Sequence, residues 1–236
     1  MSKRTKETAR LARQRLQQQR AAERRRRALF RSALAVVLVL VAGLIGYGVY
    51  VTGQPTDVKA PQQAVDENTG LRVGDGPVTV DLYVDFVCPA CKAYETSAAP
   101  VLDRYLEQGR ITLVYHPVNF LDDMTSTDYS TRAAAAAAVA ADEGKLQAYV
   151  QALFERQPPE GGPGLSDAEL VEIGRTVGLT SKAFARAVHS DKYHDWVSYV
   201  ARTADERGVR ATPTVLVDGH TLDNSVSALK TAIDAA

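Results

Sequence analysis

Apolar residues follow two patterns along this chain, and the first is one long uninterrupted run. No charged residue occurs between Ser32 and Thr56, and residues 33–51 are mainly Leu, Val, Ala, Ile and Gly. A helix rises about 1.5 Å per residue, so a run of this length can cross a hydrocarbon core of about 30 Å. The pattern predicts a single transmembrane helix over residues 32–52.

Beyond residue 70 the apolar residues fall into short stretches with strand or helix periodicity. A continuous β-branched stretch at 77–87 predicts a strand that is buried on both faces, and 111–115 predicts a second strand. Between them, residues 90–108 have a helical pattern that ends before Gly109. Further helices are expected at 130–142, 146–156, 167–177, 182–187 and 192–207.

The C-terminal stretch predicts a β-hairpin and a closing helix. Residues 214–217 and 220–222 flank Asp218-Gly219, a common two-residue turn, and 226–235 has a helical pattern. The order of elements is therefore strand, helix, strand, helices, hairpin, helix. This order is typical of an α/β, thioredoxin-like fold, here with a helical insertion over about 126–207.

Residues 53–70 separate the apolar run from the folded part. They are polar, contain Pro55 and Pro61, and show no periodicity, so they are expected to form a tether. The folded domain is expected to occupy residues 71–236. A domain of this size can bury a single sizeable core.

The charge of the chain is divided unevenly between its two ends. Residues 1–31 contain 12 lysines and arginines against two glutamates, while the whole chain has a formal net charge of zero. Positive residues before a membrane helix favour the cytoplasmic side for that end. We therefore expect 1–31 to be a cytoplasmic segment and the acidic C-terminal domain to lie outside the cytoplasm.

Two other interpretations of the N-terminal part are less well supported by the sequence. A basic segment can bind nucleic acid, but the apolar run directly behind it makes a membrane flank the better interpretation, and no nucleic-acid partner is expected. Arg26-Arg27 loosely resembles a twin-arginine signal, and a cleaved signal peptide is the alternative to an anchor. However, the apolar run exceeds the usual 7 to 15 residues and no A-x-A site follows it.

The chain contains two cysteines, which lie at a strand-to-helix junction in the sequence Cys88-Pro89-Ala90-Cys91. This spacing allows both sulfurs to lie on the first turn of a helix, where a disulfide can close and reopen. The positive end of the helix dipole favours a thiolate at the leading cysteine. The pattern predicts a redox-active pair.

Three other roles for the cysteines are less well supported. A structural disulfide across so short a loop would constrain the unfolded chain very little. A zinc site would need two more ligands, and the four histidines are not at a motif spacing. The third possibility is a pair of inert thiols. Neither a metal nor a bound cofactor is expected.

The run from Asp85 through Cys88-Pro89-Ala90-Cys91 to Lys92, together with residues 74–80 and 208–214, resembles membrane-anchored, DsbA-like thiol:disulfide oxidoreductases of the actinobacterial type. The resemblance spans roughly residues 70–236. It implies that Cys88 is the nucleophile and that Cys91 resolves the mixed disulfide. It also implies that Pro213 is cis and faces the cysteines, and that Thr212 offers backbone hydrogen bonds to a substrate peptide.

One position departs from the pattern of the family. Many relatives carry a buried carboxylate six residues before the first cysteine, where this chain has Leu82. The proton route to Cys91 is therefore open, with water and Asp85 as candidates. His116 is a candidate for tuning the Cys88 pKa, although a lone histidine is more often a solvated or hydrogen-bonded group. The residues that could tune the site are Asp85, Pro89, Ala90 and His116.

The sequence and the resemblance together predict an extracytoplasmic enzyme that oxidises exported proteins with free thiols. The resemblance implies that a DsbB-like or VKOR-like quinone-linked membrane oxidase restores its disulfide. A reductase for cytochrome c maturation or disulfide repair is the alternative within redox chemistry. A non-redox peptide-binding module or holdase is the alternative outside it.

Overall fold

The computed structural model describes Val41, Gly43 and residues 58–236. The basic segment 1–31, nearly all of the expected transmembrane helix at 32–52, and the start of the tether lie outside the described residues. Within the described part, no helix is both long and apolar enough to cross a membrane. The chain divides into two units between Asp57 and Val58, and the second unit holds the cysteines.

A six-stranded sheet forms the centre of the second unit, in the order β1-β2-β4-β3-β5-β6. Its strands are β1 (Ala64–Val65), β2 (Gly70–Val73), β3 (Val78–Val84), β4 (Ile111–Pro117), β5 (Thr214–Val217) and β6 (His220–Thr221). β3 and β4 are parallel, and every other pair is antiparallel. β3 lies between β4 and β5, and Val80 and Leu82 within it are fully buried, as expected for a central apolar strand.

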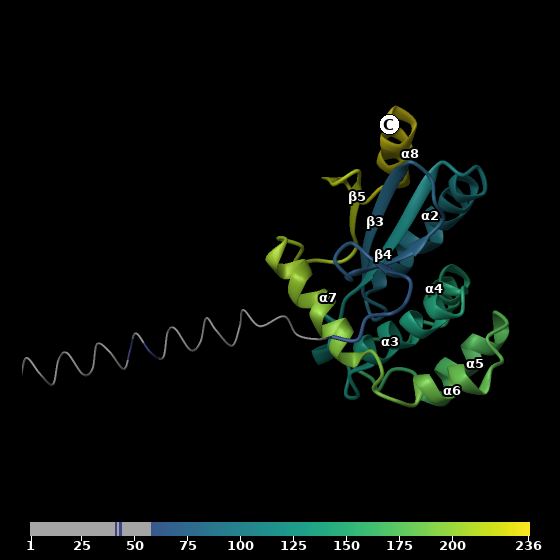
Figure 1. The fold of residues 1–236 in the computed structure, drawn as a ribbon, viewed down its shortest axis with the longest axis vertical. Helices are drawn as coiled ribbons and strands as arrows, with labels where there is room; N and C mark the ends of the chain where they lie inside the picture. Colours follow the sequence, from purple (N-terminus) through teal and green to yellow (C-terminus); the bar gives the residue numbers. More distant parts are fainter. Residues whose placement is uncertain (1–40, 42, 44–57) are drawn as a thin grey trace, which may run out of the picture. The chain divides into compact units, whose positions relative to one another are not determined.

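In the described part, two helices outside the insertion contact the sheet, and five more helices form the insertion (Figure 1). The first two are α2 (Pro89–Glu107) and α8 (Val226–Ala235). The insertion comprises α3 (Tyr129–Asp142), α4 (Leu146–Glu155), α5 (Asp167–Thr176), α6 (Lys182–Val188) and α7 (His194–Glu206), and a short 3₁₀ turn, η1 (Asp122–Met124), precedes it. The buried alanines 133–138 allow several helices to pack around α3. The predicted thioredoxin-like order with a helical insertion is confirmed, and the element ends differ by no more than three residues from those expected.

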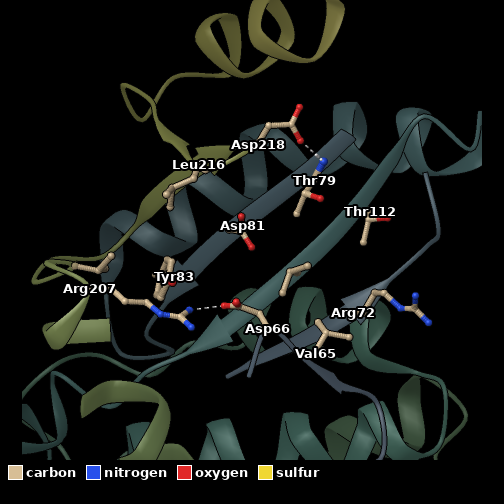
Figure 2. Close-up of a pocket in the computed structure, with 13 residues that line it drawn as sticks. Val65, Asp66, Arg72, Thr79, Asp81, Tyr83, Thr112, Arg207, Leu216 and Asp218 are labelled. Atoms are coloured by element: carbon tan, nitrogen blue, oxygen red, sulfur yellow. Dashed lines mark hydrogen bonds and ion pairs between the residues drawn. The ribbon is translucent and has the colours of Figure 1, made fainter. Parts of the chain in front are cut away.

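The two faces of the sheet differ in character because side chains alternate along each strand. Tyr115 of β4 reaches Glu95 of α2, so this face lies against α2. Asp81 and Tyr83 of β3 project from the opposite face, where a groove of about 610 Å³ runs over the strands (Figure 2). Side chains that point toward α2 and those that line the groove therefore have different surroundings.

The folded unit begins at Val58, so the expected boundary between tether and domain at residue 70 is corrected. β1 pairs with β2, and the turn between them has three successive left-handed residues, Asp66, Glu67 and Asn68, with φ of 51°, 57° and 66°. Arg207, just beyond α7, pairs with Asp66 (Figure 2), and Trp196 Nε1 donates to the Asn68 carbonyl at 2.6 Å. These long-range contacts hold a polar stretch whose own sequence has no strand periodicity.

Candidate active site

Cys88 is the N-cap residue of α2 and follows the short turn 85–87 after the central strand β3. Its backbone is extended (φ −65°, ψ 116°), and its carbonyl accepts hydrogen bonds from the Cys91 and Lys92 amides at 3.1 and 3.3 Å. Pro89 fits the next position, because a backbone N–H in the first helical turn has no intrahelical acceptor and proline lacks only this N–H. Pro89 and Ala90 are exposed, whereas 7% of Cys88 and 1% of Cys91 are exposed. Cys88 is therefore the sulfur that lies nearer the surface.

The loop before β5 lies against the Cys88 sulfur. The Thr212–Pro213 peptide bond is cis, as the resemblance implied, and Cys88 Sγ lies 3.3 Å from the Thr212 carbonyl oxygen. Asn224 Nδ2 donates to the Pro213 carbonyl at 2.6 Å and holds the other end of this dipeptide. The structure therefore brings together the two cysteines and the two residues expected to bind substrate.

The two thiols have opposite pKa shifts. A hydrogen bond donated by the Cys91 thiol lowers the pKa of Cys88 to about 5. Thr212 and the backbone amides of Cys91 and Ala90 add smaller contributions in the same direction, and burial opposes the shift. Burial, followed by the adjacent Cys88 thiolate, raises the pKa of Cys91 well above its usual range. At neutral pH the pair is a Cys88 thiolate beside a Cys91 thiol. A thiolate is the attacking species in disulfide exchange, so the geometry fits Cys88 as the nucleophile.

Asp85 is fully buried and holds three segments together. Its carboxylate accepts hydrogen bonds from the Val87 amide at 2.9 Å, the Leu121 amide at 2.9 Å and Ser130 Oγ at 2.6 Å. Burial raises its pKa to about 6, while these hydrogen bonds oppose the shift. Asp85 thus joins the turn between β3 and α2 (residues 85–88, the active-site turn) to the loop after β4 and to α3. Because both of its oxygens are engaged, it is poorly placed to serve as a mobile proton carrier for Cys91.

His116 lies on the sheet face opposite α2, which corrects its expected role as a tuning residue for Cys88. Its Nδ1 lies 3.1 Å from the Thr69 carbonyl oxygen, and its Nε2 lies 3.1 Å from Asp81 Oδ1. Its ring stacks on Tyr83 with a centroid distance of 4.2 Å. The alternation of β4 turns Tyr115 toward α2 and therefore turns His116 away from it. The histidine links β4 to β3 and to Thr69, the residue before β2.

Gln157 is a site residue that the sequence did not indicate. It follows α4, and its Nε2 donates to the Phe86 carbonyl at 3.0 Å and to the Cys88 carbonyl at 2.9 Å. Lys92 Nζ adds a second link from α2 to the same segment, donating to the Glu155 carbonyl at 3.3 Å. These contacts fasten the helical insertion to the active-site turn. They join residues far apart in the chain, and no motif marks them.

The described residues contain no group of three or more His, Cys, Asp or Glu side chains that could hold a metal ion. The site itself consists of two thiols beside the loop that carries the cis Thr212–Pro213 bond. A family model described as thioredoxin matches residues 68–235 of the chain. This chain belongs to the thioredoxin family.

Solved structures place this thioredoxin-family domain among DsbA-like proteins. The reduced DsbG of Mycobacterium tuberculosis is 32% identical with a TM-score of 0.63, and the match covers 70% of this chain and 86% of that one. The reduced DsbA of the same organism is 30% identical with a TM-score of 0.63, covering 71% and 91%. The MdbA thiol-disulfide oxidoreductase of Actinomyces oris, at 21% identity and a TM-score of 0.63, shares the fold. The DsbA-like resemblance is confirmed: the domain is of the thiol:disulfide oxidoreductase type.

Curated relatives match the chain to different extents. The serine/threonine-protein kinase PknE of Mycobacterium tuberculosis is 35% identical over 127 residues, which are 50% of this chain and 22% of the kinase. The chain therefore spans about a fifth of that relative's length. The probable disulfide bond formation protein D of Bacillus cereus is 24% identical over 204 residues, covering 85% of this chain and 92% of that protein.

Proposed function

We propose that this chain is an extracytoplasmic, membrane-anchored oxidase that introduces disulfides into exported proteins with free thiols. The observation that carries the proposal is the opposite shift of the two thiol pKa values, with Cys88 at the helix start and beside the Thr212 carbonyl. A cysteine that is stable as a thiolate is also a good leaving group. Such a pair favours the reduced form of the protein, which makes its disulfide a strong oxidant.

The reaction starts from the Cys88–Cys91 disulfide. A substrate thiolate attacks Cys88 Sγ, which forms a mixed disulfide and releases Cys91 as a thiolate that takes up a proton. A second substrate thiolate then attacks the substrate sulfur of the mixed disulfide and releases Cys88 as a thiolate. The substrate has lost two electrons and gained a disulfide, and the protein holds two reduced cysteines.

The substrate is expected to enter along the loop before β5. Ala211 is exposed and Thr212 is half-buried, so this part of the backbone is accessible beside Cys88. An extended peptide bound there would have its cysteine sulfur next to the Cys88 sulfur. Thr212 and Pro213 are the residues that we assign to substrate binding.

The location and the regeneration step rest on the N-terminal sequence and the family resemblance. The uncharged run at 32–52 and the basic residues before it support an anchor with its N-terminus in the cytoplasm. A DsbB-like or VKOR-like quinone-linked oxidase in the same membrane would accept the two electrons and restore the disulfide. No bound cofactor is required in this chain.

Single-turnover oxidation of a peptide with two thiols tests the function. The oxidised full chain should form one peptide disulfide for each Cys88–Cys91 disulfide consumed, and Cys88→Ser should form none. Cys91→Ser should accumulate mixed disulfides when it meets oxidised substrates, because the internal resolving thiol is gone. Peptide binding without any thiol exchange would instead identify a non-redox binding module.

A further inference from the structure

Glu95 of α2 is a buried carboxyl group in which only one of the two oxygens has a hydrogen-bond partner. Only 2% of the residue is exposed. Tyr115 Oη donates to its Oε1 at 3.1 Å, whereas its Oε2 has no partner. Among the described residues, no other buried carboxylate oxygen lacks one. Because an unpartnered buried polar atom is costly, this oxygen indicates a group that the protein can bind.

Glu95 lines a cavity of about 260 Å³ between α2 and α4. The volume is several times the roughly 30 Å³ that one water molecule occupies in the liquid. Asp103 of α2 and Glu155 of α4 also line the cavity, Asp103 half-buried and Glu155 exposed at its rim. Of the lining residues, all of them in the described part of the chain, none is a lysine or an arginine. Three carboxyl groups therefore share one cavity whose walls carry no positive charge.

The polar groups that remain free in this cavity are mainly hydrogen-bond acceptors. Gln151 Nε2 donates to Asp103 Oδ1 at 3.3 Å, and Thr96 Oγ1 donates to the Lys92 carbonyl at 2.8 Å. Pro100 lies inside α2 and has no N–H, so the Thr96 carbonyl lacks its usual helical donor. The cavity therefore suits a ligand that is positively charged and donates hydrogen bonds.

The spacing and the apolar wall favour an organic cation over a metal ion. The described residues contain no group of three or more His, Cys, Asp or Glu side chains that could hold a metal. Glu95 and Asp103 begin about 12 Å apart along the axis of α2, at about 1.5 Å per residue, so a compact ion cannot contact both. Ala99, Pro100 and Phe154 supply apolar wall between the carboxyl groups, which suits a chain of methylene groups.

We propose that this cavity binds a small aliphatic diamine, with one ammonium group on Glu95 and the other on Asp103. Each ammonium group carries three N–H donors for the free acceptors of the cavity. The methylene chain lies against Phe154, whose ring face also attracts a cation. Glu155 adds negative charge at the rim and draws the ligand in. The inference goes beyond the proposed thiol exchange, because the site uses neither cysteine.

The titration of Glu95 links this binding to pH. Burial raises its pKa to about 7, the Tyr115 hydrogen bond opposes this shift, and the nearby Asp103 charge adds to it. The other titratable groups that face it are Tyr94 on α2 and Glu155 on α4. An ammonium group favours the carboxylate form of Glu95. Binding below pH 7 must therefore displace the Glu95 proton, whereas binding well above pH 7 displaces none.

Calorimetric titration of the oxidised full chain with 1,4-diaminobutane tests the site. The oxidised form is used because its cysteines carry no thiol that titrates. We expect binding about tenfold weaker at pH 6 than at pH 8, because only about a tenth of a group with a pKa near 7 is ionised at pH 6. 1,4-Butanediol has the same carbon chain without the charges and should not bind.

Three substitutions locate the binding. Glu95→Gln, which still accepts the Tyr115 hydrogen bond, should weaken binding by about tenfold or more and remove its pH dependence. Asp103→Asn should weaken binding and keep the pH dependence. Glu107→Gln makes the same chemical change at an exposed position of α2 outside the cavity and should alter neither. Equal affinities of the wild-type chain, Glu95→Gln and Glu107→Gln would overturn the inference.

The wild-type chain decides the question if Glu95→Gln does not fold. Proton release on binding at pH 6, measured from the heats in buffers of different ionisation enthalpy, should disappear at pH 8. An affinity that is the same at pH 6 and pH 8, or no binding of the diamine at either pH, would contradict the site. Both of these results would leave the oxidation of thiols by the Cys88–Cys91 disulfide unaffected.

Discussion

The Cys88 sulfur lies 3.3 Å from the carbonyl oxygen of Thr212, although 124 residues separate them in the chain. The sheet creates this proximity, because β3 and β5 are antiparallel neighbours and Tyr83 pairs with Thr214. The strand that leads to the nucleophile therefore lies beside the strand that follows the substrate loop. A substrate thiolate that reaches Cys88 must pass next to the Thr212 backbone.

Alkylation of the reduced chain should report the thiolate at Cys88. We expect the rate with iodoacetamide, corrected for Cys91 labelling, to rise through about pH 5 and stay level to pH 8. Cys91→Ala removes the hydrogen bond that contributes most to the lowered pKa, so the inflection should move to higher pH. An inflection near the ordinary value of about 8.5 in the wild-type chain would contradict the site electrostatics.

The same shift should make the stability of the reduced protein depend on pH. The pKa of Cys88 is lower in the folded state than in the unfolded state, so ionisation of Cys88 stabilises the folded state. This stabilisation is complete above the unfolded pKa of about 9 and is lost as the pH falls through about 5. The Cys88–Cys91 disulfide has no titrating thiol and closes a loop too short to add much stability. Urea unfolding should therefore show the reduced chain to be more stable than the oxidised chain at pH 8. The difference should shrink toward pH 4, and the opposite trend would contradict the assignment.

Asp85→Asn should loosen the active-site turn. In wild type, the Val87 amide, the Leu121 amide and Ser130 Oγ all donate to the Asp85 carboxylate. Asparagine replaces one carboxylate oxygen with an NH₂ group, which cannot accept a hydrogen bond, so at least one of the three bonds is lost. Hydrogen bonds to a charged group are worth about 1.5–3 kcal/mol each, and we expect a destabilisation of this order at pH 8. The exposed Asp123 in η1 offers a matched control, since Asp123→Asn should leave the urea midpoint unchanged. Equal stability of the two variants would show that Asp85 is not a structural link.

Gln157→Ala should weaken the attachment of the insertion to the active site. The substitution removes the donor for the Phe86 and Cys88 carbonyls, at a cost of about 1 kcal/mol. Hydrogen exchange at the amides of residues 85–92 should become faster as the turn loosens. Gln108→Ala, an exposed position just after α2, serves as the control and should leave this exchange unchanged. Unaltered exchange in Gln157→Ala would show that the turn does not depend on this contact.

The main elements and the two cysteines could be predicted from sequence because their signals are local. Continuous apolar character marks β3, and the cysteine spacing marks the start of α2. The alternation of β4 could in principle have placed His116 on the face away from α2, but a single histidine has no pattern that reveals which face carries the helix. The packing of residues 58–70 depends on Trp196 and Arg207, more than a hundred residues later.

The burial of Glu95 and the hydrogen bonds of Gln157 depend on tertiary contacts in the same way. A glutamate in an amphipathic helix is normally solvated, and only the approach of Tyr115 and α4 shows that Glu95 is buried. Gln157 lies in a proline- and glycine-rich stretch whose composition indicates a loop and nothing about its partners. Such residues become visible only when the folded chain places distant segments in contact.

The reduction potential of the Cys88–Cys91 pair tests the oxidase assignment most directly. It is obtained by equilibrating the full chain with mixtures of reduced and oxidised glutathione and trapping the free thiols. Because the lowered Cys88 pKa stabilises the reduced form, we expect a potential above about −180 mV, the level of protein disulfide isomerase. A value near −270 mV, roughly that of thioredoxin, would contradict the oxidase assignment and indicate a reductase.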